Sequence, residues 1–223
     1  MPKERDDFHW PEYTACYAQE HTTSEQNGYA YFLQDGDFFL MNDHTIHFTV
    51  NLCRNIRQLI YQILIHRANV KTVYECGCGA GWNIRNIFKV FPDLSITGSD
   101  IAQNQIDFGR EFFAQHNDIL MPGLHDQLKV IDMSQPGAHS FVDHPADLVY
   151  CQAVTMHLED GKALRFIQNM MKLSNRYVFM GENFGWQDYP DLLARAGAHE
   201  YFKIETTTSP FSDSCIWMER IKT

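Results

Sequence analysis

Residues 73–81 read Val-Tyr-Glu-Cys-Gly-Cys-Gly-Ala-Gly, an apolar run that leads into three glycines at alternate positions. The apolar run predicts a buried strand, and the amphipathic segment after it, residues 82–90, predicts a helix. Glycine tolerates positive φ and lets the backbone approach a ligand closely. The N-terminus of the following helix offers N–H groups to a negatively charged group. This stretch therefore predicts an α/β sheet that binds a nucleotide-like ligand beside its first strand.

Strands and helices alternate along the rest of the chain. We expect strands at 71–76, 94–99, 127–131, 146–151, 176–181, 201–207 and 215–220, and helices at 82–90, 103–115, 161–173 and 189–196. This alternation predicts an α/β fold with a doubly wound, mostly parallel seven-stranded sheet and helices on both faces. The last two strands have no helix between them, so we expect one late strand to be antiparallel.

The first fifty residues differ from the rest in composition. Aromatic and acidic side chains are interleaved there, with no period of 2 or 3.6. We expect residues 1–50 to form an N-terminal cap or lid, helical in part, and residues 51–223 to form one Rossmann-like domain. Apolar positions between 52 and 64 fall on one face of a helix at the start of that domain.

Composition limits the classes of binding partner and the cellular location that we expect. The chain has 28 acidic and 18 basic residues, a net charge of −10, which argues against nucleic acid as a partner. The charged N-terminus has no apolar signal region, and the longest apolar stretch, residues 59–65, is too short to span a bilayer. Six scattered cysteines show no disulfide framework, so we expect reduced thiols in a cytoplasmic protein. A monomer and a homodimer both remain open.

The spacing of the glycines separates two kinds of ligand. A dinucleotide-binding loop has the pattern G-x-G-x-x-G, with the third glycine three residues after the second. Here the third glycine, Gly81, follows Gly79 by two residues, and Trp82 occupies the position of the dinucleotide pattern's glycine. The shorter spacing leaves less room for a pyrophosphate and favours a smaller cofactor.

The acidic-x-Gly-x-Gly-x-Gly pattern of residues 75–81 resembles the first motif of class I S-adenosylmethionine-dependent methyltransferases, of the small-molecule type. The resemblance covers the fold of roughly residues 70–220. It implies that S-adenosylmethionine is the cofactor and S-adenosylhomocysteine the product. It also implies that the loop lines the methionine part of the cofactor through Gly77, Cys78, Gly79 and Gly81, while Glu75 helps to bind the ammonium group.

Two further acidic positions extend the resemblance. Asp100 ends the second expected strand, where a carboxylate can accept hydrogen bonds from both ribose hydroxyls, and Ile101 would lie against the adenine. A role for Asp100 as the N-cap of the next helix is the alternative, and the two roles are compatible. Asp132 and Met133 resemble the next motif of the family, in which an acid receives the adenine amino group and an apolar neighbour packs on the ring. Asp132 could instead start a turn.

The fourth expected strand leads to the acceptor side of the site. The resemblance implies that the backbone around Cys151 and Gln152 flanks the sulfonium and that His157 lies near the substrate. His157 is therefore our candidate catalytic and substrate-contacting residue, although a packed structural histidine is the equal alternative. No metal-binding triad is evident in the sequence, so we expect no metal ligands.

These patterns predict methyl transfer to a small polar metabolite, with an amine nitrogen ahead of a hydroxyl oxygen as the acceptor atom. The reason is that a lid containing Trp10, Tyr13 and Tyr17 with nearby carboxylates could hold a cation by charge and cation–π contact. The same aromatic residues could instead seal the cofactor site as an apolar cover. A catalytically inactive binding or scaffold protein of the same fold, and an NAD-dependent oxidoreductase, are the other hypotheses.

Overall fold

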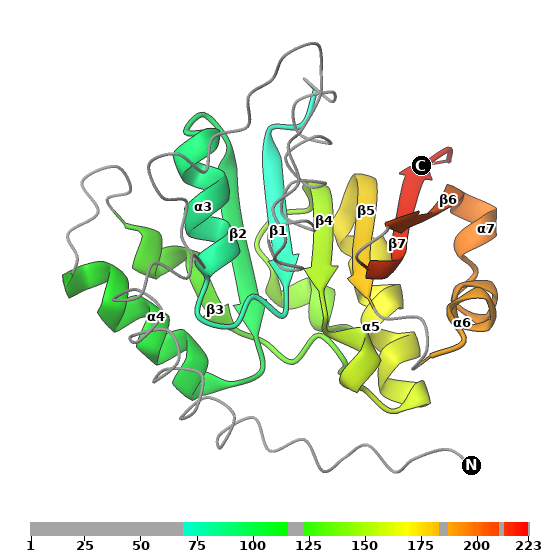
Figure 1. Cartoon of the computed structure of the whole chain (residues 1–223), viewed down its shortest axis with the longest axis horizontal. Coiled ribbons are helices and arrows are strands. Elements are labelled where there is room, and N and C mark those ends of the chain that lie inside the picture. The colour runs from blue at the N-terminus through cyan, green and yellow to red at the C-terminus, as the bar shows by residue number, and fades with distance from the viewer. Residues whose placement is uncertain (1–68, 116–122, 183–186, 210–211, 223) are drawn as a thin grey trace.

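The computed structural model describes residues 69–115, 123–182, 187–209 and 212–222. The expected cap at residues 1–50, its candidate lid residues and the expected helix after residue 51 lie outside these ranges. Strand and helix alternate as the sequence predicts (Figure 1). The strands are β1 (Thr72–Cys76), β2 (Ser95–Asp100), β3 (Leu128–Val130), β4 (Ala146–Gln152), β5 (Ser174–Glu182), β6 (Phe202–Ser209) and β7 (Ser212–Arg220). The helices are α3 (Trp82–Val90), α4 (Gln103–Gln115), α5 (Asp160–Leu173), α6 (Tyr189–Arg195) and α7 (Ala198–Tyr201), with 3-10 turns η1 (Leu124–Gln127), η2 (Ala138–Phe141) and η3 (Thr155–His157).

The seven strands form one sheet in the order β3-β2-β1-β4-β5-β7-β6. The first five strands are parallel, with Val73 of β1 paired to Ile96 of β2 on one side and to Leu148 of β4 on the other. β7 lies antiparallel between β5 and β6. The predicted fold class, including a single antiparallel late strand, is confirmed. The strand order reverses between β1 and β4, which is where ligands bind in open α/β sheets.

Side chains of alternate strand residues enter two separate cores, one on each face of the sheet. Val73, Leu148 and Phe179 pack with α3 and α4 on one face. Tyr74, Val149 and Val178 pack with α5 and α6 on the other. Strands buried on both faces explain why their sequences are continuous apolar runs rather than alternating ones.

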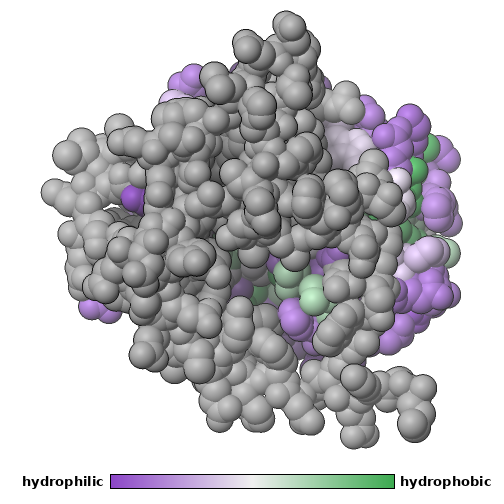
Figure 2. All heavy atoms as spheres, viewed as in Figure 1, coloured by the Kyte–Doolittle hydropathy of each residue, from purple (hydrophilic) through white to green (hydrophobic). Residues whose placement is uncertain are grey.

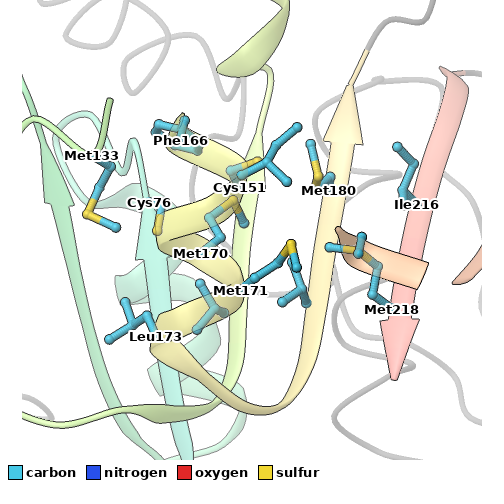
Figure 3. Close-up of a cluster of buried hydrophobic side chains, with 14 of the residues drawn as sticks. Cys76, Met133, Cys151, Phe166, Met170, Met171, Leu173, Met180, Ile216 and Met218 are labelled. Carbon is cyan, nitrogen blue, oxygen red and sulfur yellow. The ribbon is translucent and has the colours of Figure 1, made fainter. Parts of the chain in front are cut away.

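The core under α5 and α6 is rich in sulfur (Figure 3). Its sulfur-bearing side chains are Cys76, Met133, Cys151, Met170, Met171, Met180 and Met218. Methionine is unbranched and polarizable, so it fills irregular gaps between a helix and a twisted sheet. Cys76 and Cys151 lie at or near the carboxyl ends of β1 and β4, so this core reaches the end of the sheet at which ligands bind in open α/β folds.

Element boundaries differ from the prediction by a few residues, and the turns explain the differences. β5 begins at Ser174 rather than 176, because Ser174 ends α5 in an extended conformation and enters the strand without a loop. The short helix α7 is not predicted, since a single turn after Gly197 contains too few residues to show a period. Helices α3 and α4 have the predicted bounds.

Polar side chains dominate the visible described surface around β6, α6 and α7, at the right of Figure 2. Exposed ion pairs there include Lys203 with Glu205, and Arg195 with Asp160 and Asp191. In the part of the chain that the structure describes, no helix has both the length and the apolar composition needed to cross a bilayer.

Replacing Arg220 with alanine is expected to destabilise the fold by about 2–3 kcal/mol. Its guanidinium donates to the carbonyl oxygens of Met171 and Ser174 at the end of α5, and lies 4.5 Å from the centre of the Phe202 ring. The variant leaves these helix-terminal carbonyls without the donor and removes the cation–π contact. The midpoint and slope of urea unfolding measure the loss. Arg195→Ala is the control, because it removes only exposed ion pairs and is expected to change stability little. Equal losses of stability in both variants would contradict a stabilising role for the Arg220 contacts at the end of α5.

Candidate functional site

The glycine loop crosses the end of β2. The N–H groups of Gly77 and Cys78 both donate to the carbonyl oxygen of Ser99, at 2.7 and 2.9 Å. Gly77, Gly79 and Gly81 all have positive φ, at 75°, 53° and 83°. This explains the alternate glycines, since L-residues with a side chain rarely adopt that region. The loop therefore reverses direction in the space between β1, β2 and the start of α3.

Gly77 also lies where no side chain would fit. A Cβ added to it would lie 2.4 Å from Cγ2 of Val154, on the loop after β4. The glycine loop and the loop after β4 are thus in van der Waals contact at this point. Because one loop belongs to the predicted cofactor site and the other to the predicted acceptor side, this contact connects the two halves of the candidate site.

Asp100 joins the end of β2 to the glycine loop. Its Oδ2 accepts a hydrogen bond from the Gly79 N–H and its Oδ1 accepts one from the Ala102 N–H, both at 2.8 Å. The alternative role, as N-cap of the next helix, is not what these bonds show, because Ala102 precedes α4, which begins at Gln103. Each carboxylate oxygen has a second lone pair, so both can also accept from ribose hydroxyls. Burial raises the pKa of Asp100, and the hydrogen bonds from Ala102 and Gly79 act against that rise.

Glu75 is buried at the end of β1. Its Oε1 accepts from the side-chain amide of Asn83 at 2.8 Å, and the same Asn83 nitrogen lies 3.2 Å from Oε1 of Gln152. Asn83 thus bridges the ends of β1 and β4. Sequence reasoning missed it, although its position in the first turn after the glycine loop is a usable signal.

The candidate adenine-side residues differ in their exposure to solvent. Ile101 beside Asp100 is 53% exposed, so it presents an open apolar surface at the edge of the sheet. Met133 is buried in the core under α5. Asp132 accepts from the N–H and hydroxyl of Ser134 and from the amide of Gln135, so its expected turn role is observed. Burial alone would raise the pKa of Asp132, but these hydrogen bonds outweigh it and lower the pKa.

The loop after β4 carries His157. β4 ends at Gln152, Ala153 has a φ of 54°, and the 3-10 turn η3 ends at His157, which is half-buried. Cys151 is buried, and burial raises the pKa of its thiol, which keeps it protonated. Cys76 and Cys78 are buried free thiols whose pKa values are raised for the same reason. None of these three thiols is suited to act as a thiolate.

Glu182 is a second residue that sequence reasoning missed. It ends β5, is 3% exposed, and accepts hydrogen bonds from the backbone of the loop after β4. Its only sequence signal is an acid directly after an apolar strand. Burial raises the pKa of Glu182 above its usual value, although the hydrogen bonds from Cys151 and the loop N–H groups act against that rise.

The candidate site residues that the structure describes lie at or after the carboxyl ends of β1, β2, β4 and β5. These strand ends surround the point where the strand order reverses (Figure 1). Trp10, Tyr13 and Tyr17 lie outside the described residues. Within the described ranges, no group of three His, Cys, Asp or Glu side chains is placed to hold a metal ion.

The residues present fit S-adenosylmethionine. Asp100 keeps acceptor capacity for ribose hydroxyls, and Ile101 leaves an apolar surface open for a flat ring. Gln105, 3% exposed, has a buried side-chain oxygen with no hydrogen-bond partner, and a Cβ added to Gly79 would lie 3.5 Å from that oxygen. A buried acceptor of this kind normally has a donor, so its place beside the glycine loop suits a polar ligand.

A parallel sheet of this order, with one antiparallel strand near its end and a glycine loop after β1, is the fold of class I methyltransferases. Residues 73–176 match the family model described as a methyltransferase domain. This part of the chain is therefore similar to a methyltransferase domain, and the resemblance and the cofactor that the glycine loop predicts, class I methyltransferases and S-adenosylmethionine, are confirmed. No curated protein sequence matches the chain.

Solved structures share this fold at low identity. Magnesium protoporphyrin IX methyltransferase from Synechocystis PCC 6803, solved with S-adenosylhomocysteine, is 16% identical over 78% of this chain and 89% of its own, with a TM-score of 0.57. An amino pentose methyltransferase from Micromonospora echinaspora is 11% identical over 79% of this chain and 99% of its own, with a TM-score of 0.59. An O-methyltransferase family protein from Burkholderia thailandensis is 13% identical over 76% of this chain and 56% of its own, with a TM-score of 0.57.

Replacing Gly109 of α4 with alanine is expected to disturb the glycine loop. A Cβ at this position would lie 2.2 Å from the carbonyl oxygen of Ala80, a backbone atom that cannot move without shifting the loop. Overpacking costs about 1–3 kcal/mol, more than the roughly 1 kcal/mol that alanine gains over glycine in a helix. Thermal unfolding and calorimetric binding of S-adenosylhomocysteine should both show the loss.

Gly161→Ala is the matched control for Gly109→Ala. It also replaces a helical glycine, but its Cβ would meet only the flexible end of Arg165, at 3.6 Å. We expect this control to keep its stability and its binding. If both variants bind S-adenosylhomocysteine as the unmodified protein does, α4 does not support the loop as described.

Proposed function

We propose that this protein transfers a methyl group from S-adenosylmethionine to a small polar metabolite, with an amine nitrogen ahead of a hydroxyl oxygen as the acceptor. The observation that carries the proposal is the position of Asp100, which holds Gly79 and Ala102 by their N–H groups at the end of β2. This carboxylate lies beside the glycine loop, which follows β1, and the strand order reverses on the other side of β1.

We assign the cofactor contacts as follows. The loop backbone, with Gly77, Cys78, Gly79 and Gly81, would line the methionine part, and Glu75 would receive its ammonium group. Asp100 would accept from the ribose, and Ile101, Asp132 and Met133 would surround the adenine. The backbone of Cys151 and Gln152 would flank the sulfonium. When bound, the cofactor supplies an activated methyl group for direct displacement.

The protein's own contribution is alignment and exclusion of water. The two loops in contact at Gly77 and Val154 bring the donor side and the acceptor side together. His157, at the end of η3, would hold the acceptor or take the proton that its nucleophilic atom loses. Trp10, Tyr13 and Tyr17 remain proposed lid residues on the acceptor side.

Negative charge near the candidate site favours an amine as the acceptor. Glu75, Asp100 and Glu182 lie at the ends of β1, β2 and β5, and the whole chain carries a net charge of −10. Carboxylates at one edge favour cationic ligands over anionic ones. The solved structures of this fold include amino pentose, oxygen and carbon methyltransferases. At 11–13% identity their likeness extends to the fold alone.

The four described cysteines are free thiols, which supports a cytoplasmic location.

Calorimetry with S-adenosylmethionine, S-adenosylhomocysteine and NAD tests the cofactor, and methyl-labelled S-adenosylmethionine with panels of small amines and alcohols tests the acceptor. We expect heat with both sulfur compounds, none with NAD, and label transferred to amines. Transfer to oxygen alone would refute the amine preference. Binding without transfer to any acceptor would favour a scaffold protein, and no heat with either sulfur compound would overturn the proposal.

A further inference from the structure

The loop after β4 is held by a carboxylate that comes from another strand. Glu182 Oε1 accepts hydrogen bonds from the N–H groups of Val154 and Thr155, and its Oε2 accepts one from Met156, all at 3.2 Å. These three consecutive N–H groups lie at the start of η3, where a helical turn has no internal acceptors for them. Glu182 thus caps η3 from 26 to 28 residues further along the chain.

Further polar groups contact both oxygens of Glu182. Cys151 Sγ donates to its Oε1 at 3.2 Å, and the Tyr189 hydroxyl lies 3.5 Å from its Oε2. The Tyr189 hydroxyl also lies 3.0 Å from the Thr155 hydroxyl. The three backbone N–H groups can only donate, so both oxygens of Glu182 are needed as acceptors. The network is therefore built around an acceptor with two oxygens.

The position of this loop affects both halves of the site. Ala153 leaves β4 with a positive φ, and its N–H donates to the Gly181 carbonyl at 2.8 Å, so the chain turns sharply beside β5. Val154 then packs against Gly77 of the glycine loop, and His157 ends the same turn. A shift of η3 would therefore change where His157 lies relative to the glycine loop.

We propose that Glu182 is a positioning residue for methyl transfer: by capping η3 it sets the loop of residues 153–157 against the glycine loop, so that the acceptor is aligned with the methyl donor. The inference rests on the proposed function. It predicts that Glu182 affects the transfer step more than cofactor binding, because it touches the loop on the acceptor side and not the glycine loop itself.

The test compares Glu182→Gln and Glu182→Asp with the unmodified protein. Glutamine keeps the shape but turns one of the two acceptors into a donor that faces backbone N–H groups. Aspartate keeps the charge and is shorter by one methylene, so it cannot reach all three N–H groups; it is the variant to use if the glutamine variant does not fold. Glu200→Gln on α7 is the control, because it neutralises an exposed carboxylate that has no part in the site.

Amide hydrogen exchange of Val154, Thr155 and Met156 measures whether Glu182 caps η3, and it needs no methyl acceptor. We expect protection to fall at least about tenfold in Glu182→Gln and less in Glu182→Asp. The calorimetric Kd for S-adenosylhomocysteine should stay within about threefold of the unmodified value. With an acceptor that the panel identifies, kcat should fall about 10- to 100-fold in Glu182→Gln, with an intermediate value in Glu182→Asp.

Unchanged amide protection would overturn the capping role, and an unchanged kcat, or a loss confined to cofactor binding, would overturn the positioning role. A failure of the proposed function gives a different pattern, since the unmodified protein would then bind no S-adenosylhomocysteine or transfer no methyl group. Exchange in the variants still tests the cap in that case.

Discussion

Replacing Asp100 with alanine is expected to weaken the binding of S-adenosylhomocysteine by about 100-fold or more. The variant loses a carboxylate that would accept from two ribose hydroxyls, and hydrogen bonds to a charged group are worth about 1.5–3 kcal/mol each. It also releases the N–H groups of Gly79 and Ala102, which shape the loop. Isothermal calorimetry with S-adenosylhomocysteine measures the change. Asp100→Asn is expected to lose nearly as much, since its amide group would face one of those two N–H donors.

Asp107→Ala is the control for Asp100. Asp107 lies on α4, the helix that follows Asp100, but its carboxylate is exposed and accepts from the side chain of Gln103 at 2.7 Å. We expect its Kd to match that of the unmodified protein. Thermal unfolding of all variants separates a binding defect from loss of fold. A folded Asp100→Ala that binds within threefold of the unmodified protein would remove Asp100 from the cofactor site.

Gly77→Ala is expected to have a similarly large effect, on stability as well as binding. The new side chain must adopt a φ of 75°, at a cost of about 1–2 kcal/mol, and its Cβ would lie 2.4 Å from Val154 Cγ2, which adds overpacking of about 1–3 kcal/mol. The loop must move to relieve the overlap, so cofactor binding falls with stability. Urea unfolding and calorimetry measure the two losses.

Two variants separate the conformational cost from the overlap. Gly137→Ala has nearly the same φ, 74°, but nothing lies within 4 Å of its Cβ, so it should show the conformational cost alone. Val154→Ala combined with Gly77→Ala removes the overlapping methyl groups and should recover part of the loss. Equal losses in Gly77→Ala and Gly137→Ala, with no recovery in the double variant, would show that the two loops do not meet at this point.

Much of the fold was predictable because its signals are local. The apolar run of β1, the amphipathic helix α3 and the alternation after them each arise from residues close together in sequence. The boundaries were less predictable, as at Ser174, where helix passes into strand without a turn residue. α7 was missed because one helical turn has no period to detect.

The candidate site was predictable where a motif supplied it. Asp100 lies beside the glycine loop, as the resemblance implies, and its oxygens reach Gly79 and Ala102. Asn83 and Glu182 were not found, because their partners are distant in sequence: Gln152 for the first, and the backbone of residues 154–156 for the second. No pattern along the chain shows such pairs.

The sequence by itself determined the strand–loop–helix unit of residues 73–90, and with it the fold class and the cofactor, because backbone conformation and amphipathicity are set by neighbouring residues. Only the tertiary structure decided that Glu182 caps the loop after β4 and that Val154 lies against Gly77. The physical reason is that these contacts join chain segments brought together by sheet pairing. Their energies depend on burial and on donors and acceptors meeting in space, which sequence spacing does not show.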